Sequence, residues 1–328
     1  MNIDSKSNCK KDNSIFREFN AIRKEAKIKE CFYFDHSNCS KEIIKAHTVQ
    51  NNKILNKLSR NGMVIALDES SLPNIQLKEI GRGVASVFYG FCKHHDMEIF
   101  KDIDLNNYQN TPIQNFLYAY RGFAKCCHSK LEKKQMFILC NEKLSSNNRC
   151  ITDICIDGLD NALSIDFEFI NDRFKNGFIS KDYSELVTKH ITLDYECKFA
   201  VATVLSPVYD LNGKKINNLF DNSKPVNMLC FNVFPENGKT YIIFSWFKYA
   251  NNIYRNFFYK LLTLTQQQKI NFLNQFIPLE TENIYINPEL WDSWTENAKE
   301  MFYNFFNSPN FIQKIDYNKE TSFDLFSK

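Results

Sequence analysis

The stretch "CFYFDHSNCSKEIIKAHTVQNN", from Cys31 to Asn52, contains two cysteines and two histidines within seventeen residues, although the whole chain has only six histidines. Cysteine thiolates and histidine imidazoles are good ligands for Zn²⁺. Two interpretations follow from this crowding. The stretch is half of a metal site, or it belongs to a reduced intracellular protein whose local composition is unusual.

A second half-site lies in "GFCKHHDMEIF", where Cys92 and His95 have a C-x2-H spacing. This short spacing, at an expected junction between a strand and a helix, directs a thiolate and an imidazole at one point. Cys31 and Cys39, which are spaced C-x7-C, supply the other two ligands. The sequence therefore predicts a structural Zn²⁺ site made of Cys31, Cys39, Cys92 and His95. His36 is a reserve ligand, so the choice between His36 and His95 stays open.

Length and composition predict a large folded protein. The chain has 328 residues, beyond the usual size of one hydrophobic core, so we expect two domains. Hydrophobic residues make up 44% and aromatic residues 15%, which is enough apolar material for packed cores. Gly and Pro number only 9 and 8, and no GxGxxG or P-loop pattern occurs. A nucleotide-binding enzyme of either common kind is therefore not expected.

The sequence also bears on location. No segment approaches about 18 consecutive apolar residues, so we predict no membrane span. The segment "MNIDSKSNCKKDNS" is polar and lacks the apolar centre of a secretory signal peptide. The cysteines number eleven, an odd count, and we expect them to be mostly reduced thiols. These features predict a cytoplasmic protein.

Basic residues concentrate near the cysteines and histidines. Residues 1–60 carry 13 Lys and Arg against 7 Asp and Glu, whereas residues 135–328 carry 19 against 23. An excess of positive charge suits a polyanion, so nucleic acid is the first candidate partner of the N-terminal region. A solvated basic helix would explain the same charge, and a protein partner is then the alternative.

Hydrophobic periodicity predicts both helices and strands in the first 140 residues. We expect a charged amphipathic helix over 14–30 and a short helix over 51–62 that ends at Asn61-Gly62. Another helix should begin directly after Cys92, and a long amphipathic helix that opens with Thr-Pro should cover 111–140. Strands are expected over 63–68, 74–81 and 85–92.

The polar run at 141–149 is the expected linker. It divides the chain into a zinc-binding domain over 1–140 and an α+β domain of unknown role over 150–328. In the second domain, Asn212-Gly213 and Asn237-Gly238 each predict a hairpin, because both residue types tolerate the positive φ of a type I′ turn. The predicted class is α+β, with a ββα-like zinc domain followed by a larger mixed domain. Helices are also expected over 151–175, 263–277 and 288–306.

The N-terminal region resembles the HNH group of ββα-metal endonucleases. The resemblance covers residues 30–104 and rests on the first cysteine pair, then "KAHTVQNN", then "GFCKHHDMEIF". It implies that His47 is the general base that activates water, and that Mg²⁺ or Mn²⁺ stabilises charge on a scissile phosphate. It also implies that one of His94 and His95 ligates zinc while the other faces the catalytic ion.

Several positions differ from the family pattern. The first cysteine spacing is seven, Ala46 stands where many members have an acidic metal ligand, and the insertion after His47 is long. Asn51 or Asn52 could replace the family's asparagine. Possible carboxylate ligands of the catalytic ion are Asp96, Asp102 and Asp104. Carboxylates on the surface of a helix are the favoured interpretation of the same residues.

Two functions from different classes follow. The first is a metal-dependent nuclease that hydrolyses phosphodiester bonds, with His47 and His94 as catalytic residues. The order "AHTVQ", "GFCKHHD", "FLYAYRGF" is similar to that of uncharacterised bacterial proteins found near anti-phage systems, which implies a role in defence. The second is a non-catalytic module, in which zinc holds the fold and the protein binds nucleic acid or a protein partner.

The remaining candidates are interpreted as structural. The Cys-Cys-His run at 126–128 lies in an expected helix, where adjacent residues cannot easily share one metal, and His190 is isolated. No local signature of a Cys/His protease occurs. Asn287-Pro288 fits a helix start, and the neighbouring Trp291 and Trp294 share one helix face, which is typical of packing.

Overall fold

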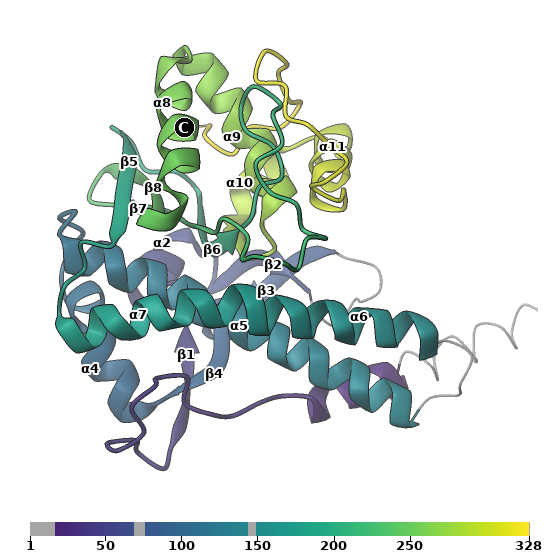
Figure 1. Cartoon of the computed structure of the whole chain (residues 1–328). Coiled ribbons are helices and arrows are strands. Elements are labelled where there is room, and N and C mark those ends of the chain that lie inside the picture. Colours follow the sequence, from purple (N-terminus) through teal and green to yellow (C-terminus); the bar gives the residue numbers. More distant parts are fainter. Residues whose placement is uncertain (1–16, 69–75, 144–148, 328) are drawn as a thin grey trace, which may run out of the picture.

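The structure is a computed structural model that describes residues 17–68, 76–143 and 149–327. It confirms the α+β class, with 48% helix, 20% strand and antiparallel sheets. Helices cover both faces of one large sheet (Figure 1). In the described part of the chain, no helix combines the length and the apolar character needed to cross a membrane.

Seven strands form the main antiparallel sheet, in the order β3-β2-β9-β6-β7-β8-β5. Two further strands, β1 (Ile43–His47) and β4 (Val87–Cys92), pair separately with each other. The strands of the main sheet are β2 (Met63–Leu67), β3 (Leu77–Gly81), β5 (Leu186–Leu193), β6 (Phe199–Leu205), β7 (Leu229–Glu236), β8 (Lys239–Phe247) and β9 (Ile284–Ile286).

Strand β7 separates two hydrophobic cores. Leu229, Phe231 and Val233 belong to one core, whereas Cys230 and Phe234 belong to the other. Successive side chains of a strand point to opposite faces, so an almost continuous apolar run fills both layers. The first core lies under α8 (Asn251–Thr263), α9 (Gln266–Glu280) and α11 (Glu296–Phe306), and the second under α5 (Pro112–Lys143) and α7 (Glu168–Ser180).

The long helix predicted over 111–140 is confirmed as α5, which packs closely on the sheet (Figure 1). A Cβ atom at Gly122 would lie 3.2 Å from the backbone nitrogen of Thr203 in β6. The helix comes this near because glycine has no side chain. The helical stretch predicted over 151–175 is also confirmed, as α6 (Arg149–Asn161), the π-helical segment η4 (Ala162–Phe167) and α7.

The hairpin predicted at Asn237-Gly238 is confirmed. These two residues have φ of 53° and 76° and connect β7 to β8, as a type I′ turn requires. In the C-terminal part, Asn287 caps α10 (Pro288–Ser293) as predicted. The rings of Trp291 and Trp294 pack together, with centroids 5.3 Å apart.

The hairpin predicted at Asn212-Gly213 is reduced to a single antiparallel bridge, and its turn is not of type I′. Gly213 has a positive φ of 74°, but Asn212 does not, and the flanking residues form one isolated bridge between Tyr209 and Lys215. The carboxylate of Asp210 accepts a hydrogen bond of 2.9 Å from the backbone nitrogen of Asn212. This side chain supports the turn in addition to the backbone hydrogen bonds that Asp210 and Ile216 donate to Lys214 and Val208.

The helix predicted over 14–30 ends earlier than expected. In its described part, residues 17–25 are helical. The chain then leaves the helix because α5 offers other partners: Glu132 accepts hydrogen bonds from the Lys27 side chain at 2.7 Å and from the Ile28 backbone at 3.1 Å. This attachment guides the segment toward Cys31.

The helix predicted over 51–62 is also shorter. It consists of the π-helical segment η1 (Asn51–Leu55) and α2 (Asn56–Leu58), and Ser59 is already extended. Asn61 and Gly62 have φ of 52° and 76° and form a tight turn into β2. This dipeptide therefore forms a turn after the helix has ended and does not itself end the helix.

The main sheet takes strands from both sides of the expected linker. Strands β2 and β3 come from the first 140 residues, and β2 pairs with β9 from the C-terminal part. Residues 144–148 of that linker lie outside the described residues. The division into domains over 1–140 and 150–328 stays a prediction.

Two glycines allow the contact between α5 and the sheet to be tested. Gly122→Ala should lower the free energy of unfolding by about 1–3 kcal/mol, because its methyl group would push against the backbone of β6. Gly158→Ala on α6 is the matched control. Nothing lies within 4 Å of its Cβ position, so it should stabilise the protein by roughly 0.5–1 kcal/mol. Urea denaturation measures both, and equal effects would contradict the packing argument.

Candidate metal centre and histidine site

The candidate site is built on a strand pair followed by a helix. β1 and β4 are antiparallel, and α4 (Lys93–Asp104) begins directly after β4. Ile43 pairs with Cys92 at one end of the ribbon, and His47 pairs with Val87 at the other. Four residue steps along a strand separate these ends by about 13 Å. The order of elements is strand, inserted segment, strand, helix.

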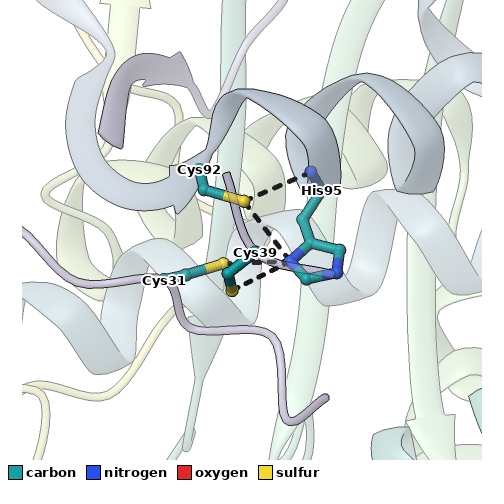
Figure 2. A group of neighbouring side chains, drawn as sticks. All are labelled: Cys31, Cys39, Cys92 and His95. Atoms are coloured by element: carbon teal, nitrogen blue, oxygen red, sulfur yellow. Dashed lines mark hydrogen bonds between the residues drawn. The ribbon is translucent and has the colours of Figure 1, made fainter. Parts of the chain in front are cut away.

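Four predicted ligands converge at the first end of this ribbon. The sulfurs of Cys31, Cys39 and Cys92 each lie 3.4 Å from Nδ1 of His95 (Figure 2). All four donor atoms lie within 4.8 Å of one another. Tetrahedral Zn²⁺, with bonds of about 2.3 Å to sulfur and about 2.0 Å to nitrogen, places such atoms roughly 3.5 Å apart. The cluster could therefore hold a zinc ion.

Local structure explains this convergence. Cys92 is the N-cap of α4, and its sulfur accepts a hydrogen bond of 3.5 Å from the backbone nitrogen of His95. The C-x2-H spacing thus places both residues in one helical turn. The loop that carries the other two cysteines is attached by Phe32, whose backbone nitrogen donates to the Gly90 carbonyl at 2.7 Å. The Tyr33 ring lies 4.6 Å from the His95 ring and covers it.

The protonation states suit metal binding. Burial lowers the pKa of His95, so its ring is neutral near pH 7. Burial raises the pKa of Cys31, and burial with the neighbouring Cys31 raises that of Cys39 to about 12. At Cys92 burial opposes ionisation, but hydrogen bonds from the His95 backbone and from the side chain and backbone of Ser40 lower the pKa to about 7. Bound Zn²⁺ requires all three thiolates, so its binding would release protons.

The reserve ligand lies beside the cluster. Nδ1 of His36 is 3.7 Å from the sulfur of Cys39, and the His36 side chain is exposed. The four atoms that come together include His95 and leave His36 outside.

His47 occupies the far end of the ribbon and is half-buried. Its Nδ1 lies 3.0 Å from the hydroxyl oxygen of Ser86, and that hydroxyl donates to the Val49 carbonyl at 3.1 Å. A serine hydroxyl has a single hydrogen, so it accepts from Nδ1–H and leaves Nε2 of the neutral ring unprotonated. Burial, and then the charges of Arg121 and Arg82, lower the pKa of His47.

An ion pair accompanies His47. Both terminal nitrogens of Arg121 donate to the Asp104 carboxylate, at 2.8 and 2.6 Å, and Gln50 donates to the same carboxylate at 2.9 Å. The guanidinium carbon lies 4.0 Å over the Phe100 ring. Burial opposes ionisation of Asp104, but Arg121 outweighs it and keeps the pKa of this carboxyl below its ordinary value.

The structure places the other predicted residues as follows. His94 is exposed, and its ring lies 5.2 Å from that of His95. Burial raises the pKa of Asp96, and Ala46 is buried in the same core as Phe88. Within residues 17–68, 76–143 and 149–327, the Cys/His cluster is the one group of three or more such ligands that meet. The predicted catalytic ion therefore has no second assembled ligand set among these residues.

Sequence reasoning missed three residues near His47. Ser86 and Arg82 belong to the segment inserted between β1 and β4, and Arg121 comes from α5. No local spacing relates them to His47. By contrast, the Cys-Cys-His run at 126–128 is structural as expected, since buried His128 bonds to the Ile28 carbonyl at 3.1 Å.

Comparison with known proteins identifies no matching family model, no matching curated protein and no matching solved structure. Function is therefore inferred from the geometry of the site.

The metal centre makes a direct prediction. Freshly purified, unchelated protein should contain about one zinc per chain, because four converging N and S ligands bind Zn²⁺ tightly at neutral pH. Cys92→Ala should lose the metal and unfold at lower temperature. Cys155→Ala, which removes a half-buried thiol outside the cluster, should keep it. Elemental analysis and thermal unfolding measure these effects, and wild-type protein free of zinc would rule out the centre.

Proposed function

We propose that the protein is a zinc-stabilised, HNH-like nuclease in which His47 is the general base. The observation that carries this proposal is the hydrogen bonding of His47. Because the Ser86 hydroxyl is committed to the Val49 carbonyl, the ring donates through Nδ1 and has a free lone pair on Nε2. The lowered pKa of His47 keeps this ring neutral near pH 7, which is the form that a base requires.

The proposed reaction is hydrolysis of a phosphodiester bond. Nε2 of His47 accepts a proton from the attacking water while the water oxygen bonds to phosphorus and the leaving oxygen departs. Positive charges near His47 would attract the negatively charged phosphate. They come from Lys45, Arg82 and Arg121. Asp104 offsets part of this charge through its pair with Arg121.

Zinc has a structural role in this proposal. The cluster and His47 lie at opposite ends of the β1–β4 ribbon, about 13 Å apart along the strand. Zinc would fix the loop before β1 to the start of α4 and so hold the ribbon in register. Among the residues that the structure describes, no second ligand set is assembled. No step is therefore routed through Mg²⁺ or Mn²⁺, and the cleavage assay is run with and without these ions. A role in bacterial anti-phage defence belongs to the same proposal.

Replacement of His47 separates catalysis from structure. His47→Ala should reduce cleavage of DNA or RNA by about 10²–10⁴, while zinc content and thermal stability stay close to those of the wild type. His190→Ala is the matched control, because His190 is a partly buried histidine on β5. His94→Ala tests the proposed role of His94 beside a catalytic ion. Cleavage is measured with and without Mg²⁺ or Mn²⁺.

The pH dependence of the same assay gives an independent check. The rate should rise with pH as His47 loses its proton, and the midpoint of this rise should lie below about pH 6.5, since the pKa of His47 is lowered. A stable, zinc-loaded His47→Ala protein with undiminished cleavage would refute the proposal.

A second candidate function is a non-catalytic binding module. Two observations favour it: Ala46 contributes a buried methyl group where a metal ligand would stand, and the carboxylate of Asp104 is occupied by Arg121. In this case zinc only holds the fold, and the charges around His47 bind a polyanion or a protein partner.

Salt dependence distinguishes these partners. Oligonucleotide binding without cleavage should weaken steeply with salt, because each neutralised phosphate releases counterions. Lys45→Gln on β1 should weaken binding and reduce the salt slope by about 1. Lys189→Gln, an exposed lysine on β5, is the matched control and should change neither. Fluorescence anisotropy measures both, and binding that does not depend on salt would indicate a protein partner.

A further inference from the structure

The three sulfurs of the metal centre differ in their access to solvent. Cys92 is 0% exposed and Cys31 is 9% exposed, whereas Cys39 is only partly buried. Cys39 directly follows an exposed segment, residues 35–38, so its sulfur lies at the solvent side of the cluster. The ring of exposed His36, 3.7 Å from this sulfur, marks the same side. A small oxidant would therefore reach Cys39 before the other two thiolates.

The second sulfur of a disulfide is already close. All donor atoms of the cluster lie within 4.8 Å of one another, and a disulfide needs a sulfur–sulfur distance of about 2.05 Å. Cys31 and Cys39 both lie outside helices and strands, so their loop can make this approach. Cys92 stands between β4 and α4 as the cap of that helix, and its backbone is held on both sides. The local structure favours Cys31 as the partner.

We propose that Cys39 is an oxidation site, at which a peroxide converts Cys31 and Cys39 into a disulfide and so releases zinc from the centre. This inference depends on the metal centre and is independent of nuclease activity.

The chemistry balances with peroxide as the oxidant. The Cys39 thiolate attacks one peroxide oxygen, the O–O bond breaks, and a sulfenic acid and hydroxide form. The Cys31 thiolate then attacks the Cys39 sulfur, forms the S–S bond and expels the second hydroxide. Two thiolates lose two electrons, and the peroxide with two protons becomes two waters. Zinc keeps only Cys92 and His95, which is half of a tetrahedral ligand set.

The test uses the full-length, zinc-loaded protein. Zinc content is measured first, which separates this proposal from the existence of the centre. Hydrogen peroxide is then titrated in, released zinc is followed with a chromogenic chelator, and disulfides are mapped by mass spectrometry of unreduced peptides. We expect one zinc released per Cys31–Cys39 disulfide, and recovery of zinc binding after reduction and addition of Zn²⁺.

Cys155→Ser is the matched control, because Cys155 on α6 is also partly buried but lies outside the cluster. This variant should release zinc at the wild-type rate. Retention of zinc at peroxide concentrations that oxidise Cys155 in the wild type would overturn the proposal. So would zinc release with Cys39 unmodified, or with Cys92 in the first disulfide.

Discussion

Three sulfurs and one imidazole nitrogen must meet at a single point, and the N-terminal half of the molecule is arranged to satisfy this requirement. The loop before β1 supplies two ligands, and the end of β4 and the first turn of α4 supply one each. Tyr33 extends the connection, because its ring contacts both His95 and Phe178 of α7, with centroids 4.6 and 5.4 Å away. A bound cation would join ligands from all of these elements, so the metal is expected to stabilise the whole group.

Each half of the ligand cluster was predictable because its sequence signals are local, and the shared ligand chemistry of Cys and His related the two halves. Cys92 and His95 fit one helical turn, and a residue pattern alone locates the strand-to-helix junction between them. The environment of His47 was not predictable, since neither Ser86 nor Arg121 on α5 carries a residue-type signal that relates it to His47. Such contacts depend on how distant elements pack, which no spacing rule records.

The fold shows the same limit. The class, the long helix α5 and the turn at Asn237-Gly238 follow from periodicity and turn chemistry. At Asn212-Gly213 the same dipeptide forms only a single antiparallel bridge, because Asn212 does not adopt positive φ and the Asp210 side chain bonds to the loop's backbone. The local sequence therefore limits the conformations that a segment can adopt. Contacts with neighbouring residues select one of them.

The pairing of β2 with β9 has a consequence for how the protein is made. Ile65 pairs with Ile286, so β2 lacks its second neighbour until the ribosome has synthesised residues that lie more than two hundred positions later. The β1–β4 ribbon, α4 and the ligand cluster are complete in sequence by residue 104 and can assemble long before that. During the interval, β2 presents an unpaired strand edge, which is the kind of surface that invites aggregation or a chaperone. The topology therefore allows the ligand cluster to assemble on the nascent chain before the main sheet closes.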